Sequence, residues 1–158
     1  MTKDADVVVN LPSSGWSKLP SLLPEGIEME DLMGFEMVTA TRRELLRVKD
    51  SLFQIELFRL SEDAHDQSRF QRRLRQPIFQ DVDVSLPTAE DVIIQKLRWS
   101  RGAKRPKDFA DAVAVMQVQG KSLDWPYIER WCAEHGTLDV LAEAKAEASV
   151  VWEADEPS

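Results

Sequence analysis

The chain has 158 residues, of which 43% are hydrophobic and 30% are charged, and its formal net charge is −8 at pH 7. This length fits one domain, and the composition is too apolar for a disordered protein. No apolar run approaches the roughly 20 residues of a membrane span, and the acidic net charge argues against a protein that coats nucleic acid. The lone Cys132 excludes an intramolecular disulfide. Because residues 1–12 contain no signal peptide, we expect a cytoplasmic protein.

Charge is distributed unevenly along the chain. Residues 96–107 contain six Lys or Arg among twelve positions and no acidic residue, whereas residues 139–156 contain Lys145 as their one basic residue. A basic segment in an acidic protein suits a localised anion such as a phosphate. Two solvated helix faces would explain the same charge pattern equally well.

The first half of the chain predicts a mixed sheet. β-branched residues indicate a buried strand at residues 4–10, and Phe53, Ile55 and Leu57 share one face of a strand at residues 52–58. The other elements expected here are a helix to residue 23 capped by Ser14 or Ser17, a strand at 35–41, a segment at 42–48 that fits either helix or strand, a helix from Ser61 to about Arg75 stopped by Pro77, and a strand at 82–86.

Beyond Pro87 the hydrophobic period changes from two residues to 3.6, which indicates helices. They are expected at about residues 88–100, 106–120, 124–136 and 137–150. Thr88 and Asp91 have the spacing of a capping box, and Asp124 is placed to cap the third helix. We therefore expect an α+β fold, with an α/β core at residues 1–86, a helical region at 87–150 and a tail at 151–158.

Three acidic residues of the predicted sheet are candidate metal ligands. Asp4 and Asp6 lie two apart on one strand, so both project from one face with Cα atoms about 6.7 Å apart. Glu56 lies on the polar side of the 52–58 strand. If the two strands are neighbours, three carboxylates meet on one face, and oxygen ligands of this kind suit Mg²⁺ or Mn²⁺. A solvated polar face is the alternative.

Lys96 is the second candidate, because it lies within the apolar stripe of its predicted helix. An ammonium group there must reach solvent along its stem, pair with an acid or meet an anionic ligand. Asp108 and Asp111 share a helix face and could be the acids. Elsewhere, His65 and His135 are expected at the surface, and Cys132 is expected in the core rather than as a nucleophile.

Four segments together resemble a bacterial protein family. They are TKDADVVV at 2–9, QIEL at 54–57, LPTAEDVIIQKL at 86–97 and RPKDFAD at 105–111. Their order resembles the minimal nucleotidyltransferases related to abortive-infection toxins (type IV toxin nucleotidyltransferases). The resemblance implies a DNA polymerase β-like mixed sheet followed by helices, and transfer of a nucleoside monophosphate from an NTP to a hydroxyl group of RNA or protein.

The resemblance also implies residue roles. Asp4, Asp6 and Glu56 would bind Mg²⁺ or Mn²⁺, with Glu56 alternatively deprotonating the acceptor. The nucleotide-binding residues would be Lys96 at the triphosphate, with Lys107, Asp108 and Asp111 completing the pocket.

The chain departs from the family pattern in two ways. The family has a Gly-Ser turn that cradles phosphates about a dozen residues before its D-x-D motif, and this sequence begins three residues before Asp4. Glu56 also replaces the usual Asp. We therefore expect weak metal binding, nucleotide transfer that is poor or absent, and a homo-oligomer that covers apolar surface beside the first strand. A non-catalytic interaction module and a toxin–antitoxin component are the alternative functions.

Overall fold

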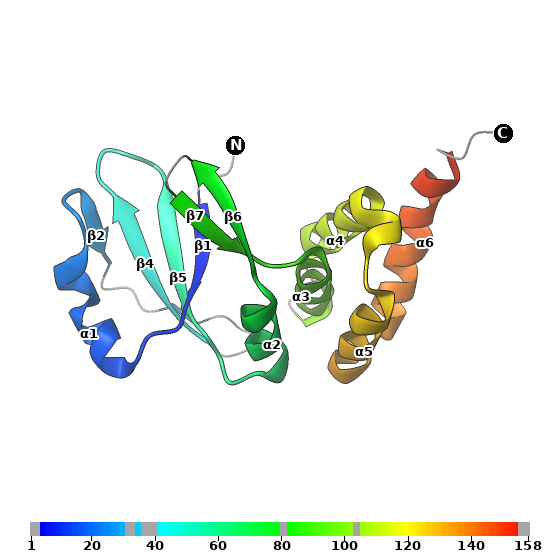
Figure 1. Cartoon of the computed structure of the whole chain (residues 1–158), viewed down its shortest axis with the longest axis horizontal. Coiled ribbons are helices and arrows are strands. Elements are labelled where there is room, and N and C mark those ends of the chain that lie inside the picture. The colour runs from blue at the N-terminus through cyan, green and yellow to red at the C-terminus, as the bar shows by residue number, and fades with distance from the viewer. Residues whose placement is uncertain (1–3, 31–33, 36–40, 80–81, 103–104, 155–158) are drawn as a thin grey trace. The chain divides into compact units, whose positions relative to one another are not determined.

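The computed structural model describes residues 4–30, 34–35, 41–79, 82–102 and 105–154. Over these residues the chain is an α+β protein with a mixed sheet, a two-stranded sheet and six α-helices (Figure 1). It divides into two compact units, Met1–Gln67 and Ser68–Ser158. The expected α+β class is confirmed.

The first unit is built on the mixed sheet. Its elements are β1 (Asp4–Val9), α1 (Ser13–Leu22), β2 (Ile27–Met29), β3 (Gly34–Phe35), β4 (Arg42–Val48) and β5 (Gln54–Arg59). The strand order is β1-β5-β4-β2, and β3 also pairs with β4. β1 runs parallel to β5, while the other pairs are antiparallel. The predicted adjacency of the first strand and the strand containing Glu56 is confirmed.

One face of this sheet carries the core of the first unit. Trp16 of α1 packs with Leu46 and Leu57, and all three are buried. The two leucines belong to the set of alternating side chains that points away from Glu56, so Asp4, Asp6, Gln54 and Glu56 are on the opposite face.

Several local predictions for the first unit need correction. Pro12, not a serine, occupies the N-cap position of α1, because the helix already begins at Ser13. The ambiguous segment 42–48 is strand β4. Phe53 precedes β5 and is 38% exposed, so it does not share the buried face with Ile55 and Leu57. Residues 36–40 of the strand expected at 35–41 lie outside the described residues.

The second unit contains a hairpin and a helical bundle. The unit boundary falls within α2 (Ala64–Arg72), and the later elements are β6 (Leu74–Phe79), β7 (Val82–Leu86), α3 (Ala89–Gly102), α4 (Pro106–Gln119), the 3₁₀ turn η1 (Gly120–Ser122), α5 (Trp125–His135) and α6 (Leu138–Ala154). The helix predicted to reach Arg75 ends at Arg72, and Pro77 lies within β6. A two-stranded sheet consists only of edge strands, where proline is tolerated.

The four helices after Pro87 bury a continuous core. Its fully buried large side chains include Ile93, Ile94, Leu97, Met116, Ile128 and Cys132. The predicted caps form: the Asp91 N–H donates to the Thr88 hydroxyl, and Asp124 accepts from the Tyr127 N–H. The tail predicted at residues 151–158 is wrong as far as Ala154, because α6 continues to that residue. No helix in the described part of the chain has the length and apolar character to cross a membrane.

Candidate functional site

The parallel pairing of β1 with β5 brings the three candidate carboxylates onto one sheet face. Asp4 is in register with Gln54, and Asp6 is in register with Glu56. Strand geometry then separates the Cα atoms of Asp6 and Glu56 by about 4.8 Å and those of Asp4 and Glu56 by about 8 Å. These separations are within the reach of side chains that share a metal pair, whose ions lie about 4 Å apart.

Glu56 has a cationic partner that the sequence did not reveal. Nη1 of Arg43 donates to both carboxylate oxygens of Glu56, at 3.1 and 2.9 Å. Arg43 lies on β4 diagonally across from Glu56, since Glu56 is in register with Leu45. The Glu56 side chain is 20% exposed and that of Arg43 is 40% exposed. Water therefore partly screens the attraction between the two charges. The two hydrogen bonds define the geometry of the pair.

The residues on this face fit a divalent cation by their chemistry. Asp4, Asp6 and Glu56 offer hard oxygen ligands, which Mg²⁺ and Mn²⁺ prefer to nitrogen or sulfur. Asp4 and Asp6 are exposed, so an ion can reach them without opening the core. Glu56 would have to exchange its contacts with Arg43 for a metal contact.

In the second unit, Lys96 pairs with both acids of the predicted cluster. Its Nζ donates to Oδ1 of Asp108 at 2.7 Å and to Oδ2 of Asp111 at 2.9 Å. Lys96 comes from α3, and the two acids come from the first two turns of α4, where their three-residue spacing places them on one face. The predicted acid pairing is thus present.

The electrostatics of this cluster favour a charged Lys96. Burial of its stem lowers the pKa of Lys96, but the hydrogen bonds to Asp108 and Asp111 outweigh burial and raise the pKa above its usual value. Arg105 adds a second positive charge, 3.9 Å from Oδ2 of Asp108. Two cations therefore face two carboxylates, so an anion binding here would compete with internal partners. Lys107 lies in the first turn of α4 and is exposed.

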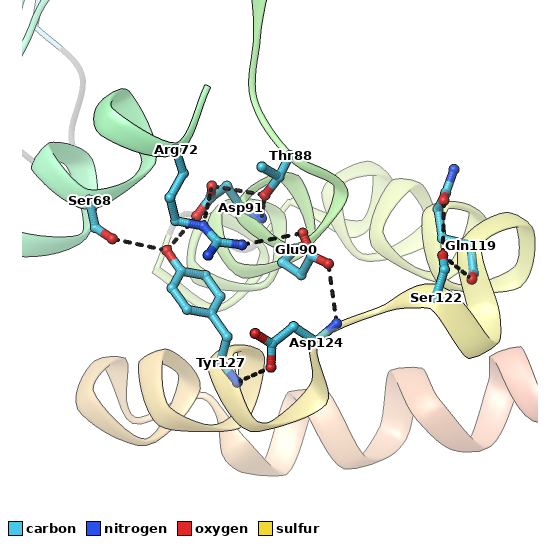
Figure 2. Close-up of polar contacts among 9 residues, drawn as sticks. All are labelled: Ser68, Arg72, Thr88, Glu90, Asp91, Gln119, Ser122, Asp124 and Tyr127. Atoms are coloured by element: carbon cyan, nitrogen blue, oxygen red, sulfur yellow. Dashed lines mark hydrogen bonds and ion pairs between the residues drawn. The ribbon is translucent and has the colours of Figure 1, made fainter. Parts of the chain in front are cut away.

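A third polar cluster surrounds Asp91, which is 1% exposed (Figure 2). Its carboxylate accepts from the Tyr127 hydroxyl at 2.8 Å and from the Thr88 hydroxyl at 2.9 Å. The Arg72 guanidinium lies over the Tyr127 ring at 3.9 Å, with its Nε 3.6 Å from the same carboxylate. Desolvation and the bond to Asp91 together raise the pKa of Tyr127. This tyrosine is a hydrogen-bond donor in the fold, not a ready nucleophile.

The same cluster connects the start of α3 to the start of α5. Oε1 of Glu90 accepts from the Asp124 backbone N–H at 3.2 Å, and Arg72 lies 3.7 Å from Oε2 (Figure 2). Burial opposes the charge on Glu90, but backbone N–H groups, Thr88 and Arg72 outweigh it and lower the pKa of Glu90. The arrangement is a helix-docking network. Of this network, only the two helix caps, at Thr88 and Asp124, were predicted from the sequence.

His65 and Cys132 are two further titratable candidates, and the structure buries both. His65, expected at the surface, is fully buried, so that prediction is wrong. His65 lies on α2, a helix made mostly of polar residues, so hydrophobic periodicity could not show which face of the helix is buried. Cys132 is fully buried and burial raises the pKa of its thiol, which confirms its expected place in the core.

Neither the protein-family models nor the curated proteins compared with this sequence give a match.

Proposed function

We propose that this chain is a nucleotidyltransferase-fold protein that binds Mg²⁺ or Mn²⁺ on the polar face of β1 and β5 and transfers a nucleoside monophosphate to an acceptor hydroxyl. The observation that carries the proposal is the register of Asp6 with Glu56, with Asp4 on the same face. The two acidic segments are far apart in sequence, and the pairing of β1 with β5 brings them together. The core packs on the opposite face, and Asp4 and Asp6 are exposed.

Phosphoryl transfer fits these residue types. It demands charge neutralisation and positioning of phosphates more than covalent chemistry by the protein. Bound divalent ions would supply that neutralisation at Asp4, Asp6 and Glu56. The chain's own contribution is to hold the three carboxylates on a sheet, which is a more rigid support than a loop.

Lys96 is the proposed contact for the triphosphate, with Lys107, Asp108 and Asp111 as the other nucleotide-binding residues. Its charge is favoured by the two carboxylates, so the ammonium is present at neutral pH. A phosphate oxygen would take the place of one carboxylate. Asp111 is the more easily displaced partner, because its side chain is 40% exposed whereas that of Asp108 is 9% exposed.

A non-catalytic interaction module is the second candidate. It is favoured by the internal pairing of Arg43 with Glu56 and of Lys96 with two acids. In such a module these ion pairs hold strands and helices together and need no ligand. The two functions differ in one measurable property, since only the nucleotidyltransferase requires a bound divalent ion.

The test compares two carboxylates on the same sheet face. Asp6→Asn removes a proposed ligand. Glu28→Gln removes an exposed carboxylate from β2, which lies at the edge of the sheet opposite β1. We expect slow, Mg²⁺-dependent label transfer from the four NTPs onto cellular RNA or protein. Asp6→Asn should abolish the transfer, and Glu28→Gln should preserve it. Transfer that survives Asp6→Asn, or a protein that neither binds Mn²⁺ nor transfers label, would overturn the proposal.

A further inference from the structure

Arg43 is held on the sheet face by more than its ion pair. In the pairing of β3 with β4, Gly34 is directly opposite Arg43. A Cβ atom at Gly34 would lie 2.8 Å from Nε and 2.9 Å from Nη2 of Arg43, closer than atoms can approach. The guanidinium therefore occupies the space that a side chain at position 34 would fill. Its place beside Glu56 is determined by both neighbouring strands.

We infer that Arg43 is a built-in counter-ion of the metal site, which occupies Glu56 until a divalent cation displaces it. This inference rests on the proposed function. A carboxylate whose two oxygens both accept from one guanidinium nitrogen has its charge already compensated. A metal that binds Glu56 must break those contacts and tolerate a nearby positive charge. Arg43 thereby lowers the metal affinity of the site and moves when metal binds.

The other arginines of the sheet do not share this position. Arg42 and Arg59 pair with Glu44, which is buried on the core-bearing face. Arg47 lies on the same strand and the same face as Arg43, but it pairs with Glu30. Arg47 is therefore a matched control, because its removal deletes the same charge from the same face without touching a proposed ligand.

The experiment measures Mn²⁺ binding by isothermal titration calorimetry for the full chain and its variants. Arg43→Gln should bind Mn²⁺ about tenfold more tightly, as expected for removing one unit charge a few ångströms from a partly exposed site. Arg47→Gln should change the affinity by less than about twofold. The gain in Arg43→Gln should shrink as salt is added.

Gly34→Ala tests the same inference without changing charge. The backbone of Gly34 is not in a left-handed conformation, so alanine is compatible with β3. Gly34 on β3 and Glu56 on β5 flank the guanidinium from opposite sides, so the new methyl group should press it toward Glu56 and leave Mn²⁺ binding no tighter than in the wild type. Arg43→Met, which removes the same charge, keeps the inference testable if Arg43→Gln fails to fold.

Nuclear magnetic resonance provides a direct view of Arg43. Addition of diamagnetic Mg²⁺ to the wild-type chain should shift the Arg43 Nε–Hε signal and leave that of Arg47 in place. If the wild type binds Mn²⁺ and neither Arg43→Gln nor Arg43→Met binds it more tightly, the counter-ion role is wrong while the metal site stands. If no variant binds Mn²⁺, the proposed function fails, and this inference fails with it.

Discussion

Replacement of Lys96 by Met measures how far the second unit depends on its central ion cluster. Loss of one partner of a buried ion pair costs about 3–5 kcal/mol, and loss of a surface pair costs about 0–1 kcal/mol. The Lys96 side chain is 25% exposed and that of Asp108 is 9% exposed, so the cluster lies between these limits. We expect Lys96→Met to lower the free energy of unfolding by about 2 kcal/mol.

Urea unfolding followed by circular dichroism gives this value directly. Lys107→Met is the matched control, because Lys107 is exposed in the first turn of α4, and it should change stability by less than about 0.5 kcal/mol. Asp111→Asn should cost less than Lys96→Met, since the Asp111 carboxylate is the more exposed one. If Lys96→Met is as stable as the wild type, the acids do not hold the ammonium, and the structural account of this cluster is wrong.

Three further predictions concern the α3–α5 region. Tyr127→Phe removes a donor to the buried Asp91 carboxylate and should cost about 1–2 kcal/mol in urea unfolding; an unchanged midpoint would contradict the network. The pKa of Glu90 is lowered from 4.5, so its stabilisation is complete above that pH and is lost as pH falls through the folded pKa. Glu90→Gln should therefore flatten the acid limb of a stability–pH curve. Cys132 should resist thiol reagents at neutral pH until unfolding, and rapid labelling of the native chain would refute its burial.

The sequence predicted the elements whose signals are local. Thr88, Asp91 and Asp124 have cap spacings that a few neighbouring residues determine, and their hydrogen bonds form as expected. Strand β5 was recognisable from alternation alone. The shared face of Asp6 and Glu56 followed once the two strands were assumed to be neighbours, and the structure supplies their parallel register.

The features that the sequence missed depend on pairing between distant segments. Nothing in the alternation of 42–48 selects Arg43 as the partner of Glu56, because the choice depends on how β4 and β5 align. The end of α2 was missed for a related reason. Residues 74–79 become a strand by pairing with β7, and their own sequence, with its central Pro77, lacks the usual signature of one.

The most direct test of the metal-site proposal is to locate a bound ion in solution. Mn²⁺ is paramagnetic, so added in small amounts it broadens the amide signals of residues near its site. We predict selective loss of signals from β1 and β5, centred on Asp6 and Glu56, with no such loss in Asp6→Asn and full retention of the effect in Glu28→Gln. Broadening that avoids β1 and β5, or that persists unchanged in Asp6→Asn, would contradict a metal site on this sheet face.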